Sequence, residues 1–212
     1  MTKSKLFSIL MFVFTNEQIY RLLIYSPYRK REVWRFISYT LLHSDIIHLI
    51  LNNLLLFFTS FTLETEQGYW KVVVLYLSGA IAGALGTSVF QPRLLMIGSS
   101  AGVYSLLISH TSHLILNFTN LKFKYFRIIA LIFLCASDIG FLIIQILFAK
   151  KDSPPISIAA HFSGALNGLL LGFVLFSGPK IGIFQCLKYL SLILYLTALT
   201  YLNLYDVFII IQ

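Results

Sequence analysis

Residues 70–90 read WKVVVLYLSGAIAGALGTSVF, an apolar stretch with a single charge, Lys71, near its start. A membrane-spanning α-helix needs about 20 consecutive apolar residues to cross the hydrocarbon core of a bilayer. This stretch has that length, and it also carries small residues at Gly79, Gly83 and Gly86 that allow close packing between helices in a membrane. The sequence here predicts a transmembrane helix packed against other helices.

Further apolar stretches lie on both sides of this one. They predict spans at Ile46–Leu63, Ser100–Leu116, Phe126–Phe148, Ile156–Phe176 and Phe184–Leu204. Near the N-terminus, Leu6–Phe14 is too short to cross at 1.5 Å per residue, and extending it to Ile24 brings in Asn16, Glu17 and Gln18. We expect a polytopic all-α membrane protein, a bundle of six to seven transmembrane helices whose first span is short or tilted.

The composition supports lipid as the solvent for much of the chain. Apolar residues make up 58% of the sequence and charged residues 11%, against about 25% charged in a soluble domain. The net charge is +8, but Lys and Arg lie at the ends of apolar runs, where lipid head groups are found. We therefore expect the lipid bilayer, and no nucleic acid, as a partner. We expect a single transmembrane domain over residues 1–212, with residues 25–45 in the membrane interface.

Gly98–Ser99–Ser100–Ala101–Gly102 has the form G-x-S-x-G. The α/β-hydrolase setting of that motif is absent, because the sequence shows no alternation of strands and helices. What remains is a serine at the start of an apolar helix, where backbone N–H groups and the helix dipole stabilise negative oxygen. The motif thus indicates either a nucleophile at Ser100 or an ordinary N-cap serine.

His161 lies on one helical face with Gly164, Gly168 and Gly172. Such a stripe of small residues brings two helices into close contact in a membrane. A histidine fixed at that contact could act as a general base, or it could simply form a hydrogen bond between helices.

Four more polar or aromatic side chains are candidates for the same site. His48 and Asn52 are four residues apart on one helical face and could donate hydrogen bonds to an oxyanion. His43 is expected to tie neighbouring loops to that helix. Tyr104 follows Ser100 by four residues and could orient an imidazole, or serve only in packing.

Together these residues supply a nucleophile, a base and hydrogen-bond donors, the minimum set for acyl transfer. Four motifs carry a further resemblance, in this order: Glu32-x-Trp34-Arg35, His43-x4-His48-x3-Asn52, Gly98–Tyr104 and Ala160-His161-x2-Gly164-x3-Gly168. With these motifs, from about Tyr25 onward, the chain resembles the rhomboid family of intramembrane serine proteases.

The resemblance implies a Ser–His dyad, with Ser100 as nucleophile and His161 as base. It implies an oxyanion hole formed by His48, Asn52 and the backbone N–H of Ser100, in a water-filled cavity open to the non-cytosolic side. The remaining motif residues are then supporting: Tyr104, Gly98, Gly102, Gly164, Gly168, Trp34, Arg35 and His43.

The family also implies partners and a location. Substrates would be single-pass membrane proteins, growth-factor precursors among them, cut in or near the transmembrane segment. Phe184–Leu204 resembles the extra C-terminal span of the six-plus-one rhomboids of the eukaryotic secretory pathway, which favours the Golgi, endoplasmic reticulum or plasma membrane over mitochondria.

Other functions are weighed against this one. A non-catalytic rhomboid-like protein would bind transmembrane segments for trafficking or degradation. A small channel would need a polar path through the whole bundle, whereas the polar residues here cluster near one side of it. No cofactor is expected, and no metal, since His110 and His113 lack a third ligand in the sequence pattern.

Overall fold

The computed structural model describes residues 17–148, 157–178 and 182–211. Its elements are α2 (Glu17–Leu23), α3 (Arg35–Ser38), the 3₁₀ turn η1 (Tyr39–Leu41), α4 (Ile46–Gln67), α5 (Tyr69–Phe90), α6 (Ser100–Asn117), α7 (Lys124–Phe148), α8 (Ile158–Leu175) and α9 (Gly182–Ile211). Extended pairing within the described residues is limited to one antiparallel bridge between Tyr25 and Met96. The predicted all-α helical bundle is confirmed.

Each of the six predicted spans corresponds to one helix, with different ends. α4 runs on to Gln67 and is joined to α5 by Gly68 alone, whose φ of 94° is a conformation that favours glycine. α9 is longer than its predicted span at both ends. Leu6–Phe14 lies outside the described residues, so the short or tilted first span stays a prediction.

Four helices among the described residues, α4, α5, α8 and α9, are long and apolar enough to cross a membrane. α6 is more polar, and two of its buried serine side chains form hydrogen bonds to neighbouring helices. Ser105 donates a hydrogen bond to the Leu75 carbonyl of α5, and Ser112 donates one to the Leu169 carbonyl of α8. Its polar groups are therefore satisfied by protein, as a helix at membrane depth requires.

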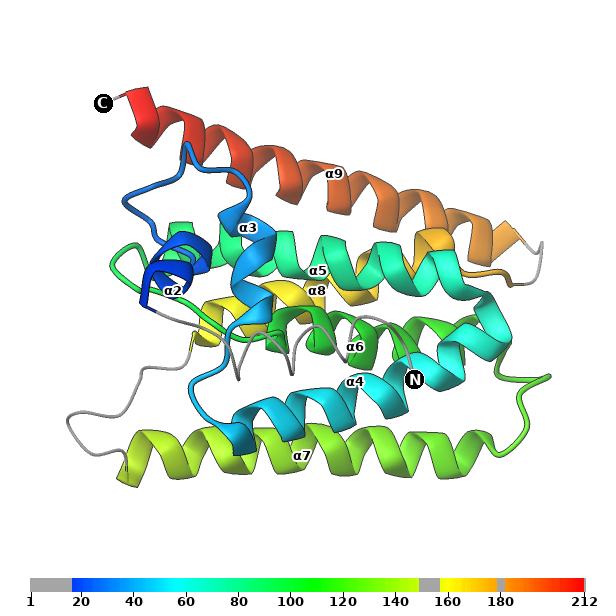
Figure 1. Cartoon of the computed structure of the whole chain (residues 1–212). Helices are drawn as coiled ribbons and strands as arrows, with labels where there is room; N and C mark the ends of the chain where they lie inside the picture. Colours follow the sequence, from blue (N-terminus) through cyan, green and yellow to red (C-terminus); the bar gives the residue numbers. More distant parts are fainter. Residues whose placement is uncertain (1–16, 149–156, 179–181, 212) are drawn as a thin grey trace.

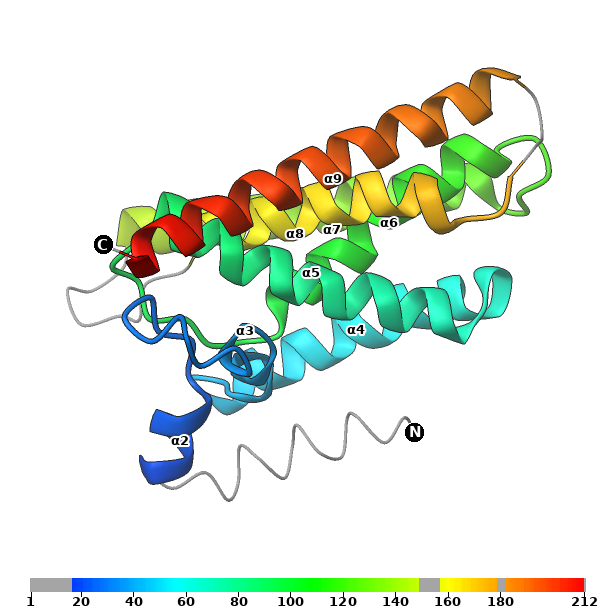
Figure 2. The same cartoon turned by 90° about the horizontal axis from the view of Figure 1, so that it is seen from above.

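The helices α5, α6 and α8 form the centre of the bundle, while α7 and α9 lie on opposite sides of it (Figures 1 and 2). Glycine residues allow these central helices to approach each other closely. A Cβ at Gly164 would collide with the Ala101 carbonyl of α6, and one at Gly168 with the Ser105 carbonyl. The backbones of α6 and α8 are thus in direct contact, as the stripe of small residues predicts.

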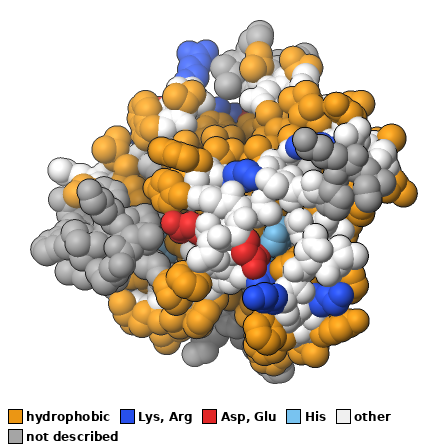
Figure 3. Space-filling model, turned by 90° about the vertical axis from the view of Figure 1, so that its right-hand side faces the viewer, with side chains coloured by type: hydrophobic (Ala, Val, Ile, Leu, Met, Phe, Trp, Pro, Cys, Tyr) orange, Lys and Arg blue, Asp and Glu red, His pale blue; other side chains and the backbone are white. Residues whose placement is uncertain are grey.

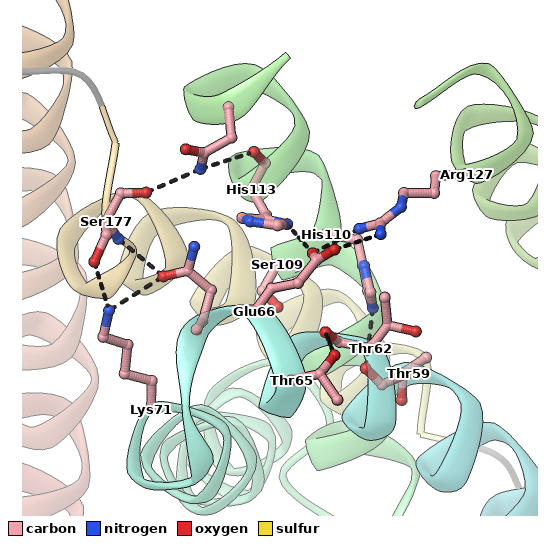
Figure 4. Close-up of polar contacts among 12 residues, drawn as sticks. Thr59, Thr62, Thr65, Glu66, Lys71, Ser109, His110, His113, Arg127 and Ser177 are labelled. Atoms are coloured by element: carbon pink, nitrogen blue, oxygen red, sulfur yellow. Dashed lines mark hydrogen bonds and ion pairs between the residues drawn. The ribbon is translucent and has the colours of Figure 1, made fainter. Parts of the chain in front are cut away.

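A polar cluster lies at the end of the bundle farthest from Ser100. This end presents charged side chains in its middle, ringed by hydrophobic ones (Figure 3). Glu66 of α4 accepts a hydrogen bond from Arg127 of α7 at 2.6 Å and lies 3.4 Å from His113 of α6 (Figure 4). On the same helix as His113, His110 lies 3.0 Å from the Thr59 carbonyl. The cluster joins α4, α6 and α7 at one end.

Candidate active site

Ser100 is the first residue of α6, and the chain turns sharply just before it. Gly98 has a φ of 103°, which a residue with a side chain rarely adopts. A Cβ there would also stand 2.9 Å from Cε1 of His48. Glycine at this position thus lets the segment bring Ser100 to the helix N-terminus while His48 lies against its backbone.

The structure brings Ser100 and His161 together. Nε2 of His161, in the first turn of α8, lies 2.8 Å from Oγ of Ser100. A neutral imidazole accepts the hydroxyl proton in this geometry, which is the first requirement for a serine nucleophile. Both side chains are only half-buried. Among the described residues, no carboxylate is paired with His161.

The Tyr104 ring stacks on the His161 imidazole, with ring centroids 4.4 Å apart and planes 13° apart. Tyr104 and Ser100 are on the same face of α6, so this helix presents both the Ser100 hydroxyl and the ring that stacks on His161. The ring limits rotation of His161 about χ2 and keeps Nε2 directed at the hydroxyl.

His48 lies in the first turn of α4, where the Asp45 carboxylate caps the helix by accepting from the His48 backbone N–H at 2.8 Å. Its Nδ1 lies 3.1 Å from the Ser44 hydroxyl, which is also 2.7 Å from Asp45. The Asp45 carboxylate can only accept, so Ser44 donates its hydroxyl proton to Asp45 and His48 Nδ1–H can donate to the Ser44 oxygen. If the Ser44 hydroxyl rotates, its proton goes to Nδ1 instead. When it goes to Nδ1, the proton of the neutral ring is on Nε2, as an oxyanion donor requires.

Asn52 and His43 lie nearby with different partners. The buried Asn52 amide donates one hydrogen bond to the His48 carbonyl at 3.0 Å, and its nitrogen carries a second hydrogen. His43 is buried, its Nε2 3.4 Å from the Ser99 hydroxyl and its ring edge-on to His48. Burial and, after it, the neighbouring His48 lower the pKa of His43 to about 4, so His43 is neutral at pH 7.

Trp34 and Arg35 lie in the segment of residues 25–45 between α2 and α4, which we call the first loop. Arg35 is buried, donates to the carbonyls of Arg21 and Ile24 at the end of α2, and is ion-paired with Glu32 at 2.6 Å. Trp34 donates to the Leu22 carbonyl at 3.2 Å. Their contacts fold the loop and do not involve the reacting groups.

No cluster of three or more metal-ligating side chains is found in the described parts of the chain. His110 and His113, which the sequence places one turn apart, are directed to the Thr59 carbonyl and to Glu66 (Figure 4). Each therefore has a partner within the protein.

Sequence reasoning missed two features of this region. Ser44 and Asp45 surround His48, yet they precede the apolar run and look like ordinary loop residues. The pattern Ser44-Asp45-x2-His48 nevertheless contains a helix N-cap signal, since Asp at an N-cap accepts from a backbone N–H three residues on. Asn167 of α8 was also missed; it donates to Ser78 of α5 and to Ser105 of α6, each at 3.0 Å.

Comparison with known proteins gives consistent matches. The family described as "Rhomboid domain" matches residues 30–178. The chain is 35% identical over 157 residues to Rhomboid-related protein 2 of Mus musculus, covering 73% of this chain and 52% of the relative. It is 31% identical over 185 residues to Rhomboid-related protein 1 of Caenorhabditis elegans, covering 87% and 52%.

A third relative is named Inactive rhomboid-related protein 2 of Caenorhabditis elegans, 31% identical over 158 residues that cover 74% of this chain and 45% of the relative. The chain spans about half the length of these curated relatives.

Proposed function

The chain belongs to the rhomboid family and is an integral membrane protein, and from this premise we propose that it is an intramembrane serine endopeptidase. One observation carries the proposal: His161 Nε2 lies 2.8 Å from the Ser100 hydroxyl, and Tyr104 stacks on the same imidazole. Nucleophile, base and the group that orients the base thus come from two helices in direct contact.

In this mechanism Ser100 Oγ attacks the carbonyl carbon of the scissile peptide while its proton passes to His161 Nε2. The tetrahedral oxyanion accepts hydrogen bonds from the Ser100 backbone N–H, His48 Nε2–H and the second N–H of Asn52. The intermediate collapses as His161 returns the proton to the leaving amine. Water then hydrolyses the acyl-enzyme ester, with His161 again acting as base.

We propose single-pass transmembrane proteins as the substrates, with growth-factor precursors as candidates. A peptide bond in a helix is already hydrogen-bonded, so the substrate helix must unwind before Ser100 can reach it. Each helical Gly lowers that cost by about 1 kcal/mol relative to Ala. The proposed location is the secretory pathway, with residues 25–45 in the membrane interface and α9 as the extra C-terminal span of one domain.

The relative named inactive keeps a second function open, a non-catalytic protein that binds transmembrane segments. The hydrogen-bonded pair of Ser100 and His161 favours the enzyme, because a binding protein has no need of that pair.

A fluorophosphonate probe tests the proposal on the purified protein in detergent. The probe forms a P–O bond to an activated serine with loss of fluoride, so it should label Ser100 at a rate that falls by about 100-fold or more in His161→Ala. Mass spectrometry of the labelled peptide identifies the serine. Labelling that does not depend on His161, or that occurs at Ser99, would contradict the dyad.

Tyr104 gives a second test of the site. In Tyr104→Phe the stacked ring remains, and cleavage of a transmembrane substrate is expected to stay close to the wild-type rate. In Tyr104→Ala the imidazole can rotate, and kcat is expected to fall by about 10- to 100-fold with little change in KM. Equal losses in both variants would show that the hydroxyl group, and not the ring, is needed.

A further inference from the structure

One buried carboxylate joins three segments that are distant in the sequence. Asp206, near the C-terminal end of α9, accepts a hydrogen bond from Lys30 of the first loop at 2.8 Å. Their side chains are 7% and 5% exposed. The buried Ser88 hydroxyl of α5 donates to the same carboxylate oxygen. The views in Figures 1 and 2 both place this end of α9 beside the first loop.

Tyr25 of the first loop extends this arrangement towards the site. It is fully buried, and burial raises the pKa of its phenol to about 12; Ser88 and Asp206 are the polar groups that act on it. Its backbone pairs with Met96, each residue donating to the other's carbonyl at 3.1 Å. The side chain of Tyr25 makes no hydrogen bond to Ser88 or Asp206. Its backbone, five residues before Lys30, is bonded to the segment that precedes Ser100.

The first loop holds that segment at a second point. The backbone N–H of Gly98 donates to the Tyr39 carbonyl at 3.1 Å, and the Tyr39 ring lies edge-on to Tyr25. The amides of Met96 and Gly98 are thus both bonded to the loop, four and two residues before Ser100. A shift of the loop would be transmitted directly to the position of the serine.

We propose that Asp206 is a positioning residue for Ser100, acting through its ion pair with Lys30 and the pairing of Tyr25 with Met96. This inference rests on the proposed function, because it concerns the serine of that site. Removing one partner leaves the other charge buried without compensation. The loop then moves to hydrate that charge, and the two amide bonds to the segment before Ser100 weaken.

The effect of Asp206 on the position of Ser100 can be separated from its effect on the packing of α9. Apolar residues nearer the start of this helix, Leu187 and Tyr195 among them, pack against the hydrophobic core. Leu187→Ala should therefore loosen α9 and leave the first loop in place. It is the matched control for Asp206→Asn.

The experiment measures fluorophosphonate labelling of Ser100 and hydrogen exchange of the Met96 and Gly98 amides in the whole protein, below the unfolding temperature of each variant. In Asp206→Asn we expect labelling to slow by about 10- to 100-fold, as a displacement on the order of 1 Å would cause. Exchange at both amides should become faster. Leu187→Ala should lower the unfolding temperature and change neither quantity. The double variant Lys30→Met/Asp206→Leu, which removes both charges, should recover most of the labelling rate.

Wild-type labelling in folded Asp206→Asn, or unchanged exchange at Met96 and Gly98, would overturn the inference. If Asp206→Asn does not fold, Asp206→Glu replaces it, with the same changes expected at smaller size. If the wild-type protein itself is not labelled, the proposed function fails. The exchange measurement then decides alone whether Asp206 fixes the segment before Ser100.

Discussion

Ser100→Ala is expected to abolish cleavage of a co-expressed single-pass substrate, with a loss of about 10⁴-fold or more in kcat. The substitution removes the atom that forms the covalent intermediate, and nothing else at the site can replace it. His161→Ala should cause a loss of similar size, because an unactivated hydroxyl is a poor nucleophile. The two losses should not add in the double variant, since the residues act as a unit.

Ser99→Ala is the matched control for this prediction. Ser99 has the same side chain one residue earlier, but its hydroxyl lies 3.4 Å from His43 and not beside His161. Its removal should leave most of the activity. Binding of the uncleaved substrate, measured by co-purification, should persist in Ser100→Ala.

If cleavage persisted in both Ser100→Ala and His161→Ala, the proposal that this protein cleaves the substrate with Ser100 and His161 would be wrong. If the wild-type protein also failed to cleave while it still bound transmembrane segments, the non-catalytic alternative would be favoured. If Ser99→Ala lost as much activity as Ser100→Ala, the assignment of Ser100 as the nucleophile would be wrong.

The sequence predicted the features that depend on local spacing. The six helices followed from long apolar runs, and four of these helices are long and apolar enough to cross a membrane. The stripe of Gly164, Gly168 and Gly172 indicated the face of α8 that meets α6. The structure brings Ser100 and His161 within hydrogen-bond distance, and the motif resemblance had placed them in one site. The spans and the glycine stripe are set by residues a few positions apart, where helical periodicity decides which side chains share a face. Ser100 and His161 are 61 positions apart, and only the resemblance to a family placed them in one site.

Contacts between distant segments could not be predicted in this way. Lys30 and Asp206 are 176 positions apart, and each alone looks like a charge at the edge of a span. The bond between Glu66 and Arg127 has the same character, with 61 positions between the partners. Only the packing of α9 and α7 around the central helices determines that these charges meet.

Gly168→Val is expected to cause the largest loss of stability. A Cβ at Gly168 would overlap the carbonyl oxygen and carbon of Ser105, and a backbone carbonyl cannot move aside without its helix. Overpacking of this kind costs about 1–3 kcal/mol, and more when backbones collide. Because α6 carries Ser100 and α8 carries His161, separation of the two helices also lengthens the distance between Oγ and Nε2. Unfolding temperature in detergent and fluorophosphonate labelling of Ser100 should therefore fall together.

Gly140→Ala in α7 is the control, since a Cβ there meets no atom within 4 Å. Alanine is the better helix former by about 1 kcal/mol, so this variant should be as stable as the wild type or slightly more stable. If Gly168→Val proved as stable as Gly140→Ala, α6 and α8 could not be in backbone contact at Ser105. The contact between Ser100 and His161 depends on the close approach of α6 and α8. Glycine at position 168 would then not explain that approach.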